Sequence, residues 1–144
     1  MKKIVLIALS LLCVAGCKKE SAIVGKYSRT ETGIVEVIEL GSGGTYNFYN
    51  TDSAGNIDGR VQTGKYSSSN GSIEFDGQLS FTSGYYSNSS GQIARWHNYT
   101  PISGEVSGSI LKVKAKDEKA SRWGLFSETK YEDNGTTTLT FVKK

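Results

Sequence analysis

The sequence predicts an all-β protein, an antiparallel up-and-down meander of about 8–10 strands that closes into a barrel. Three observations carry this prediction. From residue 22 onward, apolar residues recur in short runs with period 2, separated by turn-forming residues. No segment sustains the 3.6-residue period of an amphipathic helix. Beyond residue 16 the chain has 18 Ser, 16 Gly and 12 Thr against five Leu, a composition that argues against a helical bundle.

The first half of this region divides into short strands with typical turn sequences between them. Residues 41–44 are Gly-rich, and residues 52–59 form a polar hairpin loop. Asn70-Gly71 and Asp76-Gly77 suit type I′ turns, in which both central residues have positive φ. The predicted strands are 23–29, 34–40, 45–49, 60–67, 73–75 and 79–82.

The second half continues the pattern with longer strands. In residues 105–115, Leu111, Val113 and Ala115 alternate with lysines and are expected to face inward. The charged segment 114–122 is interpreted as a solvated loop, and Asn134-Gly135 as a turn. Trp123 and Leu125 share a face opposite Leu139 and Phe141, so Trp123 is expected to be buried. The predicted strands are 85–87, 92–99, 105–115, 121–131 and 136–142.

The first 16 residues have the parts of a secretory signal peptide. Two lysines precede an apolar run, residues 4–12, that is too short for a permanent membrane span. The run is followed by Val14-Ala15-Gly16-Cys17, which resembles the lipobox of bacterial lipoproteins. This resemblance implies cleavage before Cys17, lipidation of its thiol and a lipidated tether at residues 17–22 before one domain, 23–144. The alternative is an ordinary secreted protein with an accidental Cys.

The same resemblance implies an address and a membrane partner. A lipidated Cys17 anchors the protein to a membrane of the bacterial cell envelope, since several acyl chains bind stably where one is marginal. Lys18, in place of an Asp, favours the outer membrane. Residues 18–21 also resemble a surface-export tether, so periplasmic and surface-facing locations stay open. Cleavage would leave Cys17 as the only Cys, which excludes a disulfide in the mature domain.

A short pattern repeats within the domain. Gly25-Lys26-Tyr27-Ser28 recurs as Gly64-Lys65-Tyr66-Ser67, and Gly44-Thr45-Tyr46 is a third variant. On these residues the chain resembles the small lipocalin-like lipoproteins over roughly residues 22–82, although Tyr27 stands where Trp is usual. The resemblance implies a lipocalin-like barrel. The alternative is that a Gly before an aromatic residue is a general feature of β meanders.

Charge and motifs argue against several functions. Without Lys2 and Lys3 the net charge falls from +3 to +1, which argues against a nucleic-acid partner. His97 is the only His, so a His-rich metal site is excluded and a catalytic triad would have to use it. Paired carboxylates of a glycosidase would have to come from ordinary strand-end acids such as Glu74, Asp76 and Glu105. We therefore predict no enzyme activity, no catalytic residues, no metal and no cofactor.

One hairpin concentrates aromatic residues around an Arg. Adjacent residues of a strand face opposite sides, so Tyr85 and Tyr86 cannot both enter a core, and some of these rings must face solvent, a barrel mouth or a partner. Aromatic faces suit sugars and amphipathic ligands, and Arg suits a carboxylate or phosphate. The alternative is that these rings merely decorate the sheet. The predicted ligand-binding residues are Tyr85, Tyr86, Arg95, Trp96 and Tyr99.

Three hypotheses for function follow. The first is a non-enzymatic, membrane-anchored binding module for a small amphipathic ligand or a glycan. The second is an envelope protein–protein interaction module without a ligand cavity, and the third is a small hydrolase. The barrel interior discriminates the first two: a lined cavity of a few hundred Å³ favours a ligand, whereas a filled interior favours docking. The sequence leaves the oligomeric state open.

Overall fold

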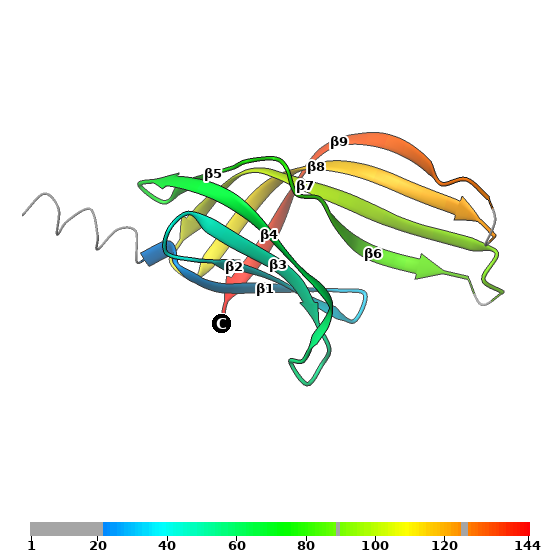
Figure 1. The fold of residues 1–144 in the computed structure, drawn as a ribbon, viewed down its shortest axis with the longest axis horizontal. Helices are drawn as coiled ribbons and strands as arrows, with labels where there is room; N and C mark the ends of the chain where they lie inside the picture. Colours follow the sequence, from blue (N-terminus) through cyan, green and yellow to red (C-terminus); the bar gives the residue numbers. More distant parts are fainter. Residues whose placement is uncertain (1–21, 89, 125–126) are drawn as a thin grey trace, which may run out of the picture.

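The computed structural model describes residues 22–88, 90–124 and 127–144, so the signal segment, Cys17 and Leu125 lie outside the described residues. The described chain forms nine antiparallel strands joined in sequence order by hairpins and short loops (Figure 1). The strands are β1 (Gly25–Glu31), β2 (Ile34–Leu40), β3 (Thr45–Thr51), β4 (Ile57–Ser69), β5 (Ser72–Phe75), β6 (Phe81–Ser87), β7 (Ile93–Ser107), β8 (Ile110–Trp123) and β9 (Lys130–Lys143).

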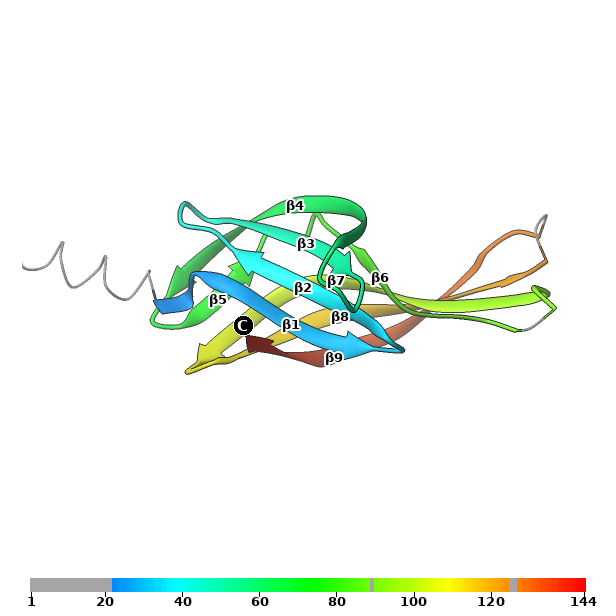
Figure 2. The same cartoon turned by 90° about the horizontal axis from the view of Figure 1, so that it is seen from below.

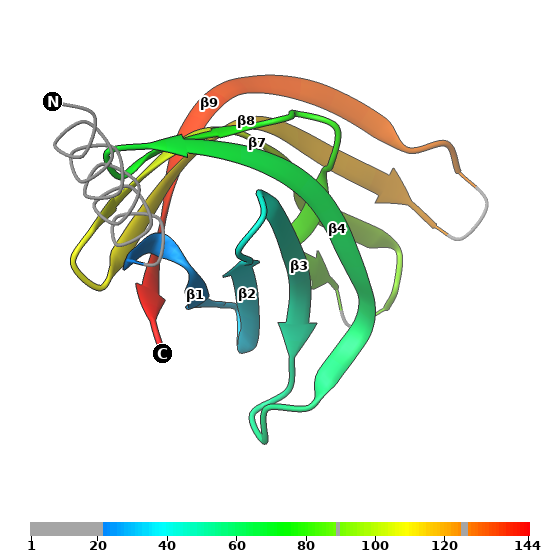
Figure 3. The same ribbon diagram turned by 60° about the vertical axis from the view of Figure 1, so that its left-hand side comes forward.

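The strands form one sheet that closes on itself. Its order is β5-β4-β3-β2-β1-β9-β8-β7-β6, and an additional pairing of β5 with β7 completes a ring from which only β6 is left out. The result is an eight-stranded antiparallel barrel plus one extra strand, seen in cross-section in Figure 3. The predicted all-β meander is confirmed, and the arrangement is compatible with a lipocalin-like barrel.

The barrel interior is filled by side chains. The three tyrosines of the repeated pattern, Tyr27, Tyr46 and Tyr66, all lie in the core. A Cβ at Gly64 would collide with the Tyr46 ring, so the glycine of the copy at residues 64–67 is required for close packing. Other core side chains include Ile38, Leu40, Phe48, Ile73, Phe75, Phe81, Leu111, Val113, Leu139 and Phe141.

Four strands continue beyond the barrel as a projecting sheet. We call this sheet the arm; it consists of β6 with residues 93–100, 116–123 and 130–136, and the eight-stranded barrel is the body. Figures 1 and 2 show the arm extending away from β1–β5. The first seven residues of β9 are all exposed, whereas Leu139 and Phe141 further along the same strand are buried.

Two predicted boundaries in the second half are wrong. Residues 105–115 are not one strand, because the chain turns at Gly108, with φ +60°, between β7 and β8. The charged segment 114–122 is not a loop but part of β8, in which lysines alternate with buried Ala115 and Asp117. The inward orientation of Leu111, Val113 and Ala115 is confirmed. Asn70-Gly71 forms the predicted turn, with φ of +53° and +86°.

The predictions for the last hairpin are also wrong. Asn134-Gly135 is not a turn: the register jumps from Lys116 opposite Thr136 to Glu118 opposite Asp133, which makes these two residues a bulge within β9. The predicted strand 121–131 spans the connection between β8 and β9 instead. Trp123 is 61% exposed rather than buried. It lies at the end of the arm, where no second wall of the barrel stands opposite it.

Candidate functional site

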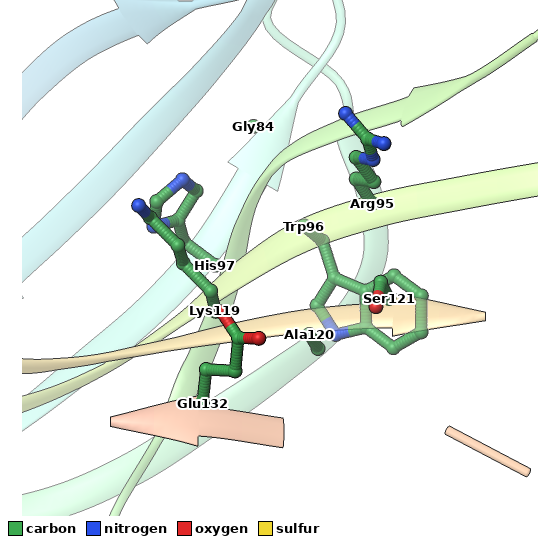
Figure 4. A pocket seen from close by; sticks show the side chains of 8 residues that line it. All are labelled: Gly84, Arg95, Trp96, His97, Lys119, Ala120, Ser121 and Glu132. Atoms are coloured by element: carbon green, nitrogen blue, oxygen red, sulfur yellow. The ribbon is translucent and has the colours of Figure 1, made fainter. Parts of the chain in front are cut away.

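A cleft of about 420 Å³ lies on the arm. By the strand register, Arg95 pairs with Ser121, His97 with Lys119, and Lys119 with Glu132, so these five residues share one face of the sheet. Figure 4 shows the Arg95 and Trp96 side chains leaving β7 in opposite directions, as the pleat requires. The residues lining the cleft are Gly84, Arg95, Trp96, His97, Lys119, Ala120, Ser121 and Glu132.

The face that carries the cleft is continuous with the inner wall of the body. The His97 ring stacks on Tyr99, with centroids 5.5 Å apart and planes 16° apart. Tyr99 packs against the core and lies 5.7 Å from the Phe81 ring. Burial and then the nearby Asp117 carboxylate raise the pKa of the Tyr99 hydroxyl, which therefore stays protonated at neutral pH.

The His97 imidazole, at the inner end of the cleft, is held by a hydrogen bond to a buried carboxylate. His97 Nδ1 lies 2.7 Å from Asp117 Oδ1, and Asp117 is 3% exposed. The Asn134 amide donates to the other carboxylate oxygen of Asp117. Asn134 belongs to the β9 bulge, and a bulge re-aims a side chain that a regular strand would point elsewhere. These contacts fix the orientation of the imidazole, and among the described residues Nε2 has no hydrogen-bond partner, so it is available to a ligand in the cleft.

A buried charged cluster joins the arm to the body. Arg29 donates from Nε to Glu36 Oε2 at 2.6 Å and from Nη2 to Ser83 Oγ at 2.8 Å. Its guanidinium also lies 5.6 Å from the ring centroids of both Tyr99 and Phe141. Burial raises the pKa of Glu36, although Ser83 and Arg29 act in the opposite direction. Strands β1, β2 and β6 are thereby linked through polar side chains.

The cluster also bears on catalysis. Ser83 is the register partner of His97, which places a Ser, the His and an Asp close together. However, the Ser83 hydroxyl is bonded to Arg29, and within residues 22–88, 90–124 and 127–144 no hydroxyl is hydrogen-bonded to the imidazole. The arrangement holds the imidazole but does not present a nucleophile to it.

The predicted ligand-binding residues divide between the two faces of the arm. Arg95 and Tyr99 lie on the face of the cleft, whereas Tyr85 stacks on Trp96 at 6.1 Å and Trp96 faces the other way. A register shift between Ser83 and Tyr86, around the bulge at Gly84 (φ +61°), brings Tyr85 to this position. Tyr86 pairs through its backbone with Arg95, and its side chain lies outside the described part of the structure.

Sequence reasoning missed most of the cleft. Lys119 lies in segment 114–122, for which the sequence predicts a loop. Ser121 lies where this segment overlaps the predicted strand 121–131, and Glu132 lies just beyond the end of that strand. Asp117 was missed too. Residues 116–119 are Lys-Asp-Glu-Lys, so the apolar alternation of Leu111, Val113 and Ala115 ends at Ala115 and no period-2 signal marks the rest of the strand.

No group of three or more His, Cys, Asp or Glu side chains within the described residues is placed to hold a metal ion. No helix in the same part of the chain has the length and apolar character to cross a membrane. Comparisons of the chain with protein-family models, with curated proteins and with solved structures returned no match.

Proposed function

We propose that the protein is a non-enzymatic binding module, anchored to a membrane of the bacterial envelope, that holds a small ligand in the cleft of its arm. The observation that carries the proposal is the cleft of about 420 Å³, lined by Arg95, His97, Lys119 and Glu132. Its volume falls within the range of small-molecule sites, roughly 300–1,000 Å³. The site lies on the arm, outside the packed interior of the body.

The chemistry of the lining favours a glycan over an amphipathic ligand. Among the eight lining residues only Trp96 and Ala120 have apolar side chains, and by the register both belong to the opposite face of the strands. A ligand in the cleft therefore meets charged groups, an imidazole and a hydroxyl. Such groups exchange hydrogen bonds with sugar hydroxyls but offer little surface to an acyl chain.

The membrane anchor is part of the same proposal. The charged start, the short apolar run and the lipobox-like tetrapeptide support a signal peptide over 1–16 and lipidation of Cys17. Membership of the small lipocalin-like lipoproteins is supported by the eight-stranded barrel and by the three buried tyrosines of the repeated pattern. Lys18 supports an outer-membrane location.

Native mass spectrometry of the protein purified from its own envelope tests the binding function. We expect a retained glycan-sized adduct that disappears in Arg95→Ala. Arg60→Ala is the matched control, since Arg60 is an exposed Arg of β4 that does not line the cleft. An adduct kept by Arg95→Ala and lost in Arg60→Ala would contradict the proposed site.

A second candidate function, docking of another envelope protein, is favoured by a different observation. The barrel interior is filled by core side chains, and the arm exposes Tyr85 (51%), Trp123 (61%) and Tyr131 (56%). Exposed aromatic residues are enriched at protein interfaces. Recovery of a stoichiometric partner protein without any small adduct, in the same native mass spectra, would favour docking over ligand binding.

The anchor has its own test. Cys17→Ser should abolish acylation and leave the chain uncleaved or released, because a hydroxyl does not form the thioether to the lipid. Incorporation of labelled palmitate shows the outcome. Equal incorporation by the variant and the wild type would contradict lipidation at Cys17.

A further inference from the structure

We infer that the ligand of the cleft is an acidic sugar, a hydroxylated molecule with one carboxylate. The inference rests on the proposed function and names the class of ligand for the same site. It depends on three features of the cleft: its charges, the orientation of its imidazole and its hydrogen-bonding groups.

The cleft carries charges without protein partners. Arg95, Lys119 and Glu132 come from three neighbouring strands, and none of them takes part in the salt bridges found among the described residues. Lys119 and Glu132 are even register partners, yet they form no ion pair within 4.0 Å. The Asp117 carboxylate is buried and bonded by His97 and Asn134, so on the exposed side of the cleft two cations stand beside the single carboxylate of Glu132, and a ligand carboxylate would meet this excess of positive charge.

The guanidinium and the ammonium interact with a carboxylate in different ways. A guanidinium offers two parallel N–H donors that match the two oxygens of a carboxylate. An ammonium adds a compact positive charge without this directional preference. We therefore assign the carboxylate to Arg95, with Lys119 supplying a second favourable charge from β8.

His97 adds a hydrogen-bonding ring nitrogen, Nε2, to the inner end of the cleft. The Asp117 carboxylate only accepts hydrogen bonds, so the short contact at Nδ1 is a donation from the imidazole. The proton of the neutral ring is then on Nδ1, and Nε2 carries a free lone pair. Asp117 also accepts a hydrogen bond from the Asn134 amide, which holds its carboxylate in position to accept from Nδ1.

The remaining groups fit hydroxyls. The Glu132 carboxylate and His97 Nε2 accept hydrogen bonds, and the Ser121 hydroxyl donates or accepts. An apolar carboxylate such as a fatty acid would leave these acceptors unmatched. A sugar acid has hydroxyls beside its carboxylate and engages both sets of groups.

Titration calorimetry of the full-length protein in detergent tests the inference, with galacturonic acid and its neutral methyl ester as probes. We expect the acid to bind at least about tenfold more tightly than the ester, the difference made by one or two charge-assisted hydrogen bonds. Arg95→Gln and Lys119→Gln should each weaken binding of the acid about tenfold, and added salt should weaken it as well.

Two control variants keep the result specific. Lys116→Gln removes an exposed lysine of the same strand that does not line the cleft, and it should bind as the wild type does. Trp96→Ala removes the ring on the opposite face. If Trp96→Ala abolishes binding while Lys119→Gln has no effect, the ligand stacks on the other face of the arm and the inference is wrong.

Other outcomes separate this inference from the proposed function. Equal affinity for the acid and the ester would overturn the acidic sugar but leave a glycan-binding module. Equal competition by inorganic phosphate or sulfate would assign the site to a free oxyanion. If the acid does not bind although the native protein retains a neutral adduct, only the inference fails; if nothing is retained and a partner protein is recovered, the proposed function fails too.

Discussion

The body and the arm share strands β7, β8 and β9 but bury the side chains of these strands differently. In the first half of β8, Leu111, Val113 and Ala115 are each fully buried. In the second half, Lys119 and Trp123 occupy the same face of the strand and are exposed. The face that lines the barrel is therefore buried only where a second wall stands opposite, and the arm has no such wall; on the other face of the arm, Ala94 and Ala120 are buried.

The transition between the two regions is marked by buried polar groups. Glu36, Ser83 and Asp117 are each no more than 4% exposed, and each is hydrogen-bonded. Buried polar groups cost free energy unless they are paired, so these bonds fix how the arm leaves the body. Most of the packing that stabilises the fold is therefore in the body, whereas the arm carries charged groups that can contact a ligand.

Phe141→Ala is the strongest test of this division. Phe141 is fully buried in the body, opposite Leu111. Its truncation should lower the free energy of unfolding by about 3–5 kcal/mol, the usual cost of a large-to-small change in a core. Since the domain has no disulfide to support it, this is a large part of a total stability of about 5–15 kcal/mol. Chemical denaturation of the variant and the wild type measures the difference.

The matched control is Trp123→Ala, an aromatic truncation on the arm. Because Trp123 is 61% exposed, the change should alter the free energy of unfolding by less than about 0.5 kcal/mol. A large loss for Trp123→Ala, comparable with that of Phe141→Ala, would show that the arm contributes to the core after all.

Arg29→Met tests the junction between the regions. The variant keeps much of the aliphatic volume but leaves Glu36 and Ser83 without their donor. We expect a loss of about 1.5–3 kcal/mol in the free energy of unfolding, typical of hydrogen bonds to a charged group. Arg60→Met, at an exposed position of β4, serves as the control. An unchanged denaturation midpoint for Arg29→Met would contradict a structural role for the cluster.

Glu36 makes the junction sensitive to pH. Its pKa is raised above the usual 4.5, mainly by burial, so the folded protein binds this proton more readily than the unfolded chain. The associated stability is present below pH 4.5 and is lost as the pH rises through the folded pKa. Glu36→Gln stays neutral and should therefore gain stability relative to the wild type as the pH rises. Denaturation midpoints of both proteins at several pH values give the comparison; parallel profiles would exclude this effect.

The sequence was sufficient to predict most of the body, apart from the turn at Gly108 and the connection at Asp76-Gly77, where Asp76 lacks the positive φ of a type I′ turn. The strands of the body alternate apolar and polar residues, and the Gly-x-Tyr pattern marks Tyr27, Tyr46 and Tyr66, all of which are buried. Asn70-Gly71 also forms its turn as predicted, because type I′ geometry depends on those two residues alone. Where local chemistry and burial agree, sequence reasoning was right.

The arm could not be predicted in the same way. Without an opposing wall, the inward face of β8 changes from Leu111, Val113 and Ala115 to Asp117 and Lys119, so 114–122 resembles a solvated loop although backbone pairing holds it in β8. Asn134-Gly135 has turn chemistry but forms a bulge, because the pairing of β8 with β9 continues on both sides of it. The cleft inherits this difficulty, since Lys119 and Glu132 meet only through that long-range register.

The smallest effects on stability are expected at the predicted site itself, in Arg95→Ala and Trp96→Ala. Arg95 is exposed and makes no ion pair with any described residue, whereas Trp96 is half-buried and stacks on Tyr85 on the face of the arm opposite the cleft. Arg95→Ala should keep its thermal midpoint close to that of the wild type, since surface substitutions usually change stability by no more than about 0.5 kcal/mol, and Trp96→Ala should stay folded because Trp96 lies outside the barrel core. Ligand binding should weaken in Arg95→Ala, whose guanidinium faces the cleft.

Thermal unfolding and glycan titration on the same samples separate the effect of each variant on stability from its effect on binding. If both variants unfold the domain, the cluster belongs to the core and the arm is not a binding surface. If both stay folded and bind as the wild type does, the ligand site lies elsewhere and docking becomes the better account of the arm.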